Sequence, residues 1–190
     1  MTHPQPLHDI RVAILVDDGF EQVEMTRPRE ALDHAGAKTT LVSPQKMHVQ
    51  AANHDEKGDR FRVDVSINDA DPLDYDALVI PGGVRSPDSL RVDNKAMLFV
   101  HALEVAQKPI AAICHGPWVL IETEYVRGKR LTSWPSLRTD ILNAGGDWVD
   151  EAVVGDGLLV TSRKPADIPR FNKAMVQLFA GRQLPAGTRA

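Results

Sequence analysis

The chain has 190 residues, 43% of them hydrophobic and 25% charged, a composition typical of one globular domain. Its net charge of -4 argues against nucleic acid or an anionic membrane as a partner, because neither would find a basic surface. No apolar run approaches the roughly 20 residues that span a bilayer, and the polar start lacks a secretory signal pattern. We expect one cytoplasmic domain over residues 1–190, with flexible tails at 1–9 and 182–190.

Short apolar runs bounded by turn residues predict the strands of the domain. The predicted strands cover residues 10–16, 39–43, 76–81, 110–114 and 158–161. Between the second and third of these, the polar segment 48–71 carries β-branched and aromatic residues in patches, which favours a small hairpin or excursion.

Helices are predicted between and after these strands, from helical spacing of apolar residues and from helix stop signals. The predicted helices cover residues 30–35, 92–106, 117–123 and 167–179. Strands that alternate with helices indicate βαβ units, and therefore an α/β fold with a mostly parallel sheet and helices on both faces. Ligands bind at the carboxyl ends of such strands. We therefore expect residues 17–24, 82–83 and 114–115 to meet in space.

Cys114 is the only cysteine, so an intramolecular disulfide is excluded. A cysteine in an apolar run is usually buried and inert. Here, however, the strand breaks into a His-Gly-Pro turn before a predicted helix, an arrangement that resembles a nucleophile elbow. At such a turn the helix amides lower the pKa of the thiol, and the amides beyond Cys114, around Gly116, form an oxyanion site.

Three polar residues are candidates to assist the thiol. His115 is either a base for the sulfur or a residue that packs or caps at the turn. Glu21 and Glu24 are either ordinary acids at a helix start or carboxyls that lie across the sheet edge from Cys114. Because two adjacent negative charges raise both pKa values, Glu24 must be neutral when it is paired with a thiolate.

Other residues at the same edge have two interpretations each. Gly82 and Gly83 either form a tight turn or present backbone amides to a pocket. Trp118 and Trp134 are either core anchors or pocket walls. The histidines lack metal-ligand spacing and no phosphate-binding glycine motif is present, so we expect no metal and no cofactor.

Several short motifs occur in one order along nearly the whole chain. They are Gly19-Phe-Glu-Gln-Val-Glu24, Asp76-Ala-Leu-Val-Ile-Pro-Gly-Gly83, Ala112-Ile-Cys-His-Gly-Pro117, Val126-Arg-Gly128, Asn143-Ala-Gly145, Trp148-Val-Asp150 and Val160-Thr-Ser-Arg163. The ordered set resembles the ThiJ/PfpI family of the class I glutamine amidotransferase-like superfamily, with the PfpI branch the closer match.

That resemblance implies a flavodoxin-like three-layer sandwich with a nucleophilic cysteine at the elbow. By position, Cys114 matches the nucleophile, Glu24 the partner acid and His115 the histidine that follows the cysteine in the PfpI branch. A third acid in that branch comes from a neighbouring subunit, and Asp88 is the position that matches it. The resemblance therefore also implies a homodimer or a ring built from dimers.

Members of the family are described as proteases, glutathione-independent glyoxalases, deglycases and stress proteins or chaperones. Our leading hypothesis is a stress-response enzyme whose thiolate attacks a small carbonyl substrate, or the same group on a glycated protein, inside a small, pinched pocket. Trp118 is expected to narrow this pocket, and Glu122 and Glu124 to lie at its rim. The alternatives are a redox-sensing stress protein or chaperone that uses an oxidisable Cys114, and an intracellular cysteine peptidase.

Overall fold

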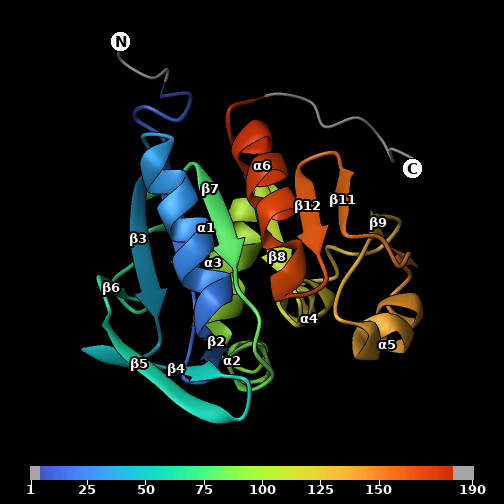
Figure 1. Cartoon of the computed structure of the whole chain (residues 1–190), viewed down its shortest axis with the longest axis horizontal. Helices are drawn as coiled ribbons and strands as arrows, with labels where there is room; N and C mark the ends of the chain where they lie inside the picture. Colours follow the sequence, from blue (N-terminus) through green and yellow to red (C-terminus); the bar gives the residue numbers. More distant parts are fainter. Residues whose placement is uncertain (1–4, 182–190) are drawn as a thin grey trace.

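A seven-stranded sheet forms the centre of the computed structural model, which describes residues 5–181 (Figure 1). All neighbouring strands are parallel except the antiparallel pair at one edge. Strands covered on both faces read as continuous apolar runs, which is why the sequence reveals the central ones. In order across the sheet the strands are β11 (Val153–Asp156), β12 (Leu159–Ser162), β8 (Ile110–Ile113), β7 (Ala77–Ile80), β1 (Arg11–Leu15), β3 (Lys38–Ser43) and β6 (Val65–Ser66).

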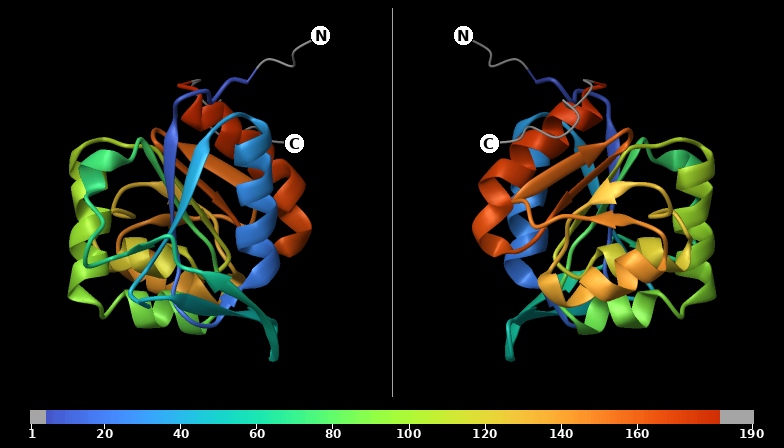
Figure 2. Two further views of the ribbon diagram at one scale, coloured as in Figure 1. Left: turned by 90° about the vertical axis from the view of Figure 1, so that its left-hand side faces the viewer. Right: turned by 90° about the vertical axis from the view of Figure 1, so that its right-hand side faces the viewer.

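Helices cover both faces of this sheet, as the two side views show (Figure 2). One hydrophobic core lies between the sheet and helices α1 (Gln22–His34) and α6 (Ile168–Phe179). A second core lies on the opposite face, under α3 (Asn94–Val105), α4 (Pro117–Glu122) and α5 (Arg138–Asn143). The predicted three-layer, flavodoxin-like sandwich is therefore confirmed.

Smaller elements complete the domain, and several of them lie at the carboxyl end of the sheet. The polar excursion forms the antiparallel hairpin β4 (His48–Asn53) and β5 (Glu56–Arg62), and β4 pairs with β2 (Phe20–Glu21) at the start of α1. The remaining elements are α2 (Arg85–Leu90), the parallel pair β9 (Arg130–Leu131) and β10 (Asp147–Trp148), and the 3-10 turns η1 (Pro72–Asp74), η2 (Pro135–Leu137) and η3 (Pro165–Asp167).

The structure extends some predicted elements and adds others. Helix α1 begins at Gln22 rather than at residue 30, and it continues through Pro28. Proline normally marks a helix boundary, but Met25, Pro28 and Leu32 share one buried face of α1, so tertiary packing holds the helix through it. Helices α2 and α5 and strand β11 are four to six residues long, too short for periodicity to reveal.

The two predicted tails differ in how far the structure describes them. Residues 1–4 and 182–190 lie outside the described residues. Within residues 5–9, Leu7 is fully buried in the core beside α1 and α6, and its N–H donates to the Ala35 carbonyl at 2.9 Å. This part of the expected flexible tail is therefore packed against the domain.

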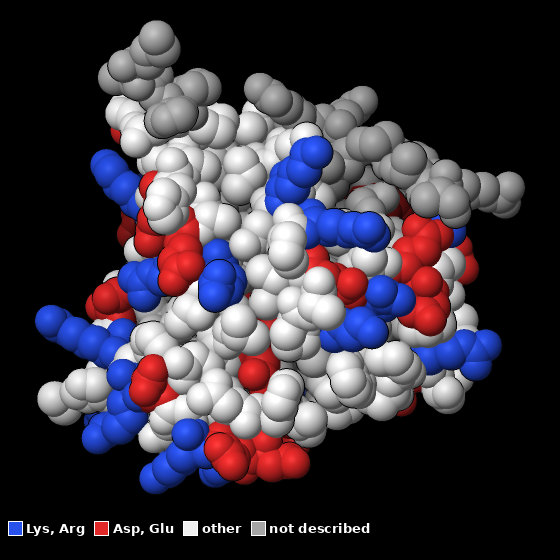
Figure 3. All heavy atoms as spheres, in the orientation of Figure 1, with Lys and Arg blue, Asp and Glu red and all other residues white. Residues whose placement is uncertain are grey.

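Two features of the described residues bear on partners: the character of the helices and the distribution of charged side chains. Within residues 5–181, no helix combines the length and the apolar character that crossing a membrane requires. On the face drawn in Figure 3, acidic and basic side chains are interspersed over the helices and the hairpin.

Leu7→Ala tests whether the N-terminal segment contributes to stability. Since the Leu7 side chain is fully buried, we expect the free energy of unfolding in urea to fall by about 2–5 kcal/mol. His8→Ala, whose side chain is 71% exposed, is the matched control and should change it by less than about 0.5 kcal/mol. Equal stabilities of the two variants would contradict the buried position of Leu7.

Candidate active site

The candidate site lies where the order of the strands reverses. The chain runs from β1 to β3 on one side of the sheet and later reaches β7 on the other side of β1. Loops that leave such a switch point in opposite directions open a crevice at the carboxyl ends of the strands. The segments after β1, β7 and β8 carry Glu24, Gly82 and Cys114, and the structure brings all three together.

Cys114 occupies a sharp turn between β8 and α4. Its φ of 61° lies in the left-handed region, which costs a non-glycine residue about 1–3 kcal/mol. The turn is held on both sides, since the Cys114 N–H donates to the Ser162 carbonyl at 3.0 Å and its carbonyl accepts from the Trp134 N–H at 2.9 Å. A side chain at Gly116 would overlap the end of β7, so the elbow requires a glycine there. The predicted strand–turn–helix elbow is thus present.

Glu24 is fully buried in the first turn of α1. Its Oε2 accepts from the Gly82 N–H at 3.0 Å, and its carboxyl also interacts with the Cys114 side chain. Burial raises the pKa of Glu24 to about 8, and the nearby Glu21 carboxylate adds to that rise. The carboxyl therefore keeps its proton at neutral pH, which is the state that pairing with a thiolate requires.

The pKa of Cys114 is raised, not lowered. Burial is the main cause, and the negative charge of an ionised Glu24 would raise it further. The backbone N–H groups of Gly83 and His115 interact with the sulfur and act in the opposite direction. The expectation that backbone amides depress the thiol pKa is therefore wrong in its net result, because desolvation outweighs them.

His115 lies beside the sulfur, with its Nδ1 3.3 Å from Sγ of Cys114. The left-handed turn at Cys114 brings the two adjacent side chains to the same side. The ring is buried, which lowers the pKa of His115 to about 4 and keeps it neutral. Trp118 contacts the ring edge-on at 5.1 Å between centres, and Trp134 stacks on it at 6.1 Å.

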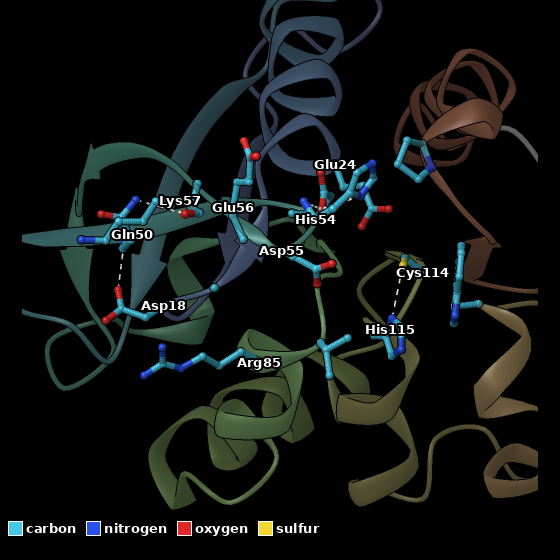
Figure 4. A pocket seen from close by; sticks show the side chains of 18 residues that line it. Asp18, Glu24, Gln50, His54, Asp55, Glu56, Lys57, Arg85, Cys114 and His115 are labelled. Carbon is cyan, nitrogen blue, oxygen red and sulfur yellow. Dashed lines mark hydrogen bonds and ion pairs between the residues drawn. The ribbon is translucent and has the colours of Figure 1, made fainter.

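These atoms line one end of an open cavity of about 770 Å³ (Figure 4). That volume lies in the range of sites for drug-sized ligands, so the expected small, pinched pocket is wrong. Residues of the β4–β5 hairpin form the wall that faces Cys114 and His115. The lining residues are Asp18, Gly19, Glu21, Glu24, Gln50, Ala51, Ala52, His54, Asp55, Glu56, Lys57, Gly83, Val84, Arg85, Cys114, His115, Trp134 and Pro165.

Most of the hairpin residues in that wall are not identifiable from the sequence, because the polar segment 48–71 gives no sign of which of its residues turn toward Cys114. Glu21 connects the hairpin to the site. Its Oε2 accepts from the His54 N–H at 3.0 Å and lies 3.5 Å from His54 Nδ1. Glu21 therefore fixes the hairpin turn over the cavity.

Five predicted pocket residues do not line the cavity. Two of them are Gly82, whose N–H donates to Glu24 at 3.0 Å, and Gly116, whose N–H donates to the Ile113 carbonyl at 2.9 Å, so the expected oxyanion site at Gly116 is wrong.

Trp118 is not among the lining residues, because it packs behind His115 and donates through Nε1 to Asp140 at 2.9 Å. Trp134 supplies the aromatic wall instead. Glu122 and Glu124 border a second cavity of about 580 Å³ between α3 and α4, so their expected place at the rim of the Cys114 pocket is wrong.

Asp88 is exposed on α2 and does not line the cavity of its own chain. Its role as an acid supplied to a neighbouring subunit stays a prediction. Among residues 5–181, no group of three or more histidine, cysteine, aspartate or glutamate side chains is arranged to hold a metal ion.

The buried Glu24 carboxyl makes stability depend on pH. Its pKa is 4.5 in the unfolded chain and about 8 in the folded protein, so folding favours the protonated form. The free energy of unfolding, relative to Glu24→Gln, should be highest below pH 4.5 and fall by several kcal/mol as pH rises to about 8. Urea denaturation of both proteins across this range measures the difference. A constant difference would mean that Glu24 titrates as an exposed acid does.

Comparison with known sequences identifies relatives along most of the chain. The sequence pattern of the DJ-1/PfpI family matches residues 10–178. The Staphylococcus epidermidis protein SERP1413 is 43% identical over 169 residues, which are 88% of this chain and 96% of its own length. A Bacillus subtilis protein named "Putative cysteine protease YraA" is 40% identical over 169 residues, which are 89% of this chain and 98% of its own length.

Solved structures agree with the sequence relatives. A two-domain Anabaena variabilis protein, with DJ-1/ThiJ/PfpI-like and ferritin-like domains, matches with a TM-score of 0.84 at 33% identity. The match covers 95% of this chain and 50% of that one. Drosophila melanogaster DJ-1β matches with a TM-score of 0.79 at 27% identity, over 91% of each chain. These findings confirm the resemblance seen in the sequence motifs, and the chain belongs to the DJ-1/PfpI family.

Proposed function

We propose that this protein is a cysteine-dependent enzyme that acts on reactive carbonyls, either free or as adducts on a larger molecule. One observation carries the proposal: the Cys114 sulfur lies between a neutral carboxyl, Glu24, and a neutral imidazole, His115, at the end of an open cavity. A nucleophile with a proton donor on one side and a proton acceptor on the other suits addition to a carbonyl group.

In the proposed reaction, the Cys114 thiol loses its proton toward His115 and the sulfur bonds to the carbonyl carbon. The carbonyl oxygen takes the Glu24 proton, which yields a hemithioacetal and leaves Glu24 as a carboxylate. The Gly83 and His115 N–H groups, which interact with the sulfur, stabilise the negative charge that develops beside it. The Glu24 carboxylate then removes the hydrogen of the carbon that now carries the sulfur and returns this proton to the neighbouring carbonyl carbon, while the hydroxyl proton of the hemithioacetal moves to the oxygen of that carbonyl. The product is a thioester between Cys114 and a 2-hydroxy acid, and water hydrolyses it to the hydroxy acid and the free thiol. For methylglyoxal, one water is consumed and lactate is formed.

The size of the cavity favours a substrate larger than a three-carbon aldehyde. About 770 Å³ accommodates a carrier molecule as well as the reacting carbonyl. The wall offers both charge signs to such a carrier, because its lining includes Asp55 and Glu56 as well as Lys57 and Arg85. An aminocarbinol adduct on a protein or a nucleotide therefore fits better than free methylglyoxal.

Cys114→Ala and Glu24→Gln test this proposal. We expect Cys114→Ala to reduce lactate formation from methylglyoxal to background, and Glu24→Gln to reduce it by about 100-fold. A glycated peptide assayed in parallel should be the better substrate of the wild type. Lactate formation that survives in Cys114→Ala would exclude the thiol mechanism, and no turnover of either substrate by the wild type would exclude carbonyl chemistry.

The same pair of residues supports a second candidate, an oxidation sensor. A protonated Glu24 carboxyl beside Cys114 would donate a hydrogen bond to a sulfinate, and no second cysteine is present to form a disulfide with a sulfenic acid.

Mild peroxide treatment followed by mass spectrometry tests the sensor. We expect two added oxygens on Cys114 of the wild type, and a smaller fraction of that product in Glu24→Gln. A Cys114 that gains no stable oxygen would rule this candidate out.

Peptidase activity is the main competing proposal. It is favoured by the name of the Bacillus subtilis relative and by the open cavity, and turnover of an unfolded protein by a clean preparation would reveal it.

Asp88 lies on the exposed face of α2, and we propose that it serves the site of a neighbouring subunit in a homodimer or larger ring. The proposed compartment is the cytoplasm, where the lone thiol stays reduced.

A further inference from the structure

We propose that Ser136 is the outer member of a Cys114–His115–Ser136 proton relay, through which the thiol proton leaves the buried sulfur for solvent. The inference rests on the proposed role of Cys114 as a nucleophile and adds a residue that the sequence motifs do not identify. Three features of the molecule support it: the two contacts of the His115 ring, the exposure of Ser136, and the loop that holds Ser136 in place.

The two ring nitrogens of His115 face different partners. Nδ1 lies 3.3 Å from the Cys114 sulfur, and Nε2 lies 3.4 Å from the Ser136 hydroxyl. The second contact is long for a hydrogen bond, as catalytic contacts often are before substrate binds. A hydroxyl both donates and accepts, so Ser136 satisfies Nε2 whether or not that nitrogen carries a proton.

The three side chains of the relay run from the interior of the protein to its surface. Cys114 and His115 are each 7% exposed, whereas Ser136 belongs to the exposed residues. Solvent can therefore exchange protons with the Ser136 hydroxyl, and that hydroxyl is the outer contact of the buried ring.

The loop before α5 is fixed against the turn that carries Cys114. The Trp134 N–H donates to the Cys114 carbonyl at 2.9 Å, and the Trp134 ring stacks on His115 with 24° between the planes. Ser136 follows two residues later in η2, whose Leu137 N–H donates to the Trp134 carbonyl. The position of Ser136 is therefore set by the same residue that holds the ring.

In the relay, the thiol proton moves from Sγ to Nδ1 of His115. At the same time the Nε2 proton moves to Oγ of Ser136, and the Ser136 proton moves to a water molecule. The products are a thiolate that accepts from Nδ1–H, a neutral ring, a Ser136 hydroxyl that donates to Nε2, and a hydronium ion that the solvent buffers. No imidazolium forms at any stage.

A relay without an imidazolium agrees with the surroundings of the His115 ring. Burial between two tryptophans opposes a positive charge on His115 and lowers its pKa. A ring that had to hold the thiol proton as an imidazolium would incur this desolvation cost, whereas a ring that exchanges one proton for another does not.

Alkylation of Cys114 by iodoacetamide tests the relay without any carbonyl substrate. We expect Ser136→Ala to slow alkylation about 5- to 10-fold. This is the effect of losing one hydrogen bond, here the bond that the Ser136 hydroxyl donates to Nε2 of His115 when Cys114 is a thiolate. Ser136→Thr keeps the hydroxyl and should restore most of the rate. Thr139→Ala removes another exposed hydroxyl three residues further on and should leave the rate unchanged.

A double-mutant cycle shows whether Ser136 acts through His115. In a His115→Ala background, Ser136→Ala should have no further effect on the alkylation rate. Nitrogen-15 NMR of the imidazole should also show a smaller shift of the His115 tautomer populations between thiol and thiolate in Ser136→Ala than in the wild type.

An alkylation rate in Ser136→Ala equal to that of the wild type would overturn the inference. So would a Ser136→Ala substitution that slows alkylation by the same factor in the His115→Ala background as in the wild type. Neither result depends on carbonyl turnover. The relay can therefore fail while the proposed function holds, and the reverse is also true.

Discussion

Gly82 packs against the side chains of both Glu24 and Cys114, and a Cβ at this position would lie 2.5 Å from the Cys114 Cβ and overlap the Glu24 carboxyl. The absence of a side chain lets the end of β7 approach both the acid and the thiol while its N–H donates to Glu24. Gly116 has the same function one strand further on, where it lets the elbow pack on β7. The site depends on these two close approaches of backbone to side chain.

Burial then determines the chemistry of the side chains brought together. It raises the pKa of Glu24 and of Cys114 and lowers that of His115, and desolvation is the first cause in all three. Each shift favours the neutral form. The resting site therefore holds three uncharged groups, and the thiolate must be made by moving a proton when it is needed. This is why the proton routes through Glu24 and through His115 matter more than the acidity of the thiol itself.

The elements that shape the site divide into a scaffold and its attachments. The parallel sheet and its helices set where β1, β7 and β8 end. The β4–β5 hairpin and the loop before α5 are added around those ends, and they provide eight of the 18 residues that line the cavity. Trp134 and Ser136 of that loop also contact the His115 ring. Substrate choice is expected to depend on these attachments, because loops on a rigid scaffold carry binding specificity.

The sequence alone determines the central strands and the residues at their ends. Each central strand is a continuous apolar run followed by a turn signal, and both features are local in the chain. The order of strands and helices then implies a parallel sheet, whose carboxyl ends must meet, so the chain order by itself predicts that Glu24, Gly82 and Cys114 lie together. The fold does bring these three residues together.

Only the tertiary structure decided the properties that depend on neighbours distant in the chain. The pKa of Cys114 rises because the packed domain removes water from the thiol, and no local pattern reports that loss. Helix α1 passes through Pro28 because the core beneath it is continuous. Trp118 turns away from the cavity toward Asp140, whereas Trp134 and Ser136 reach His115 from 19 and 21 positions further along the chain. Such contacts arise from how the layers pack, and local periodicity and turn residues carry no information about them.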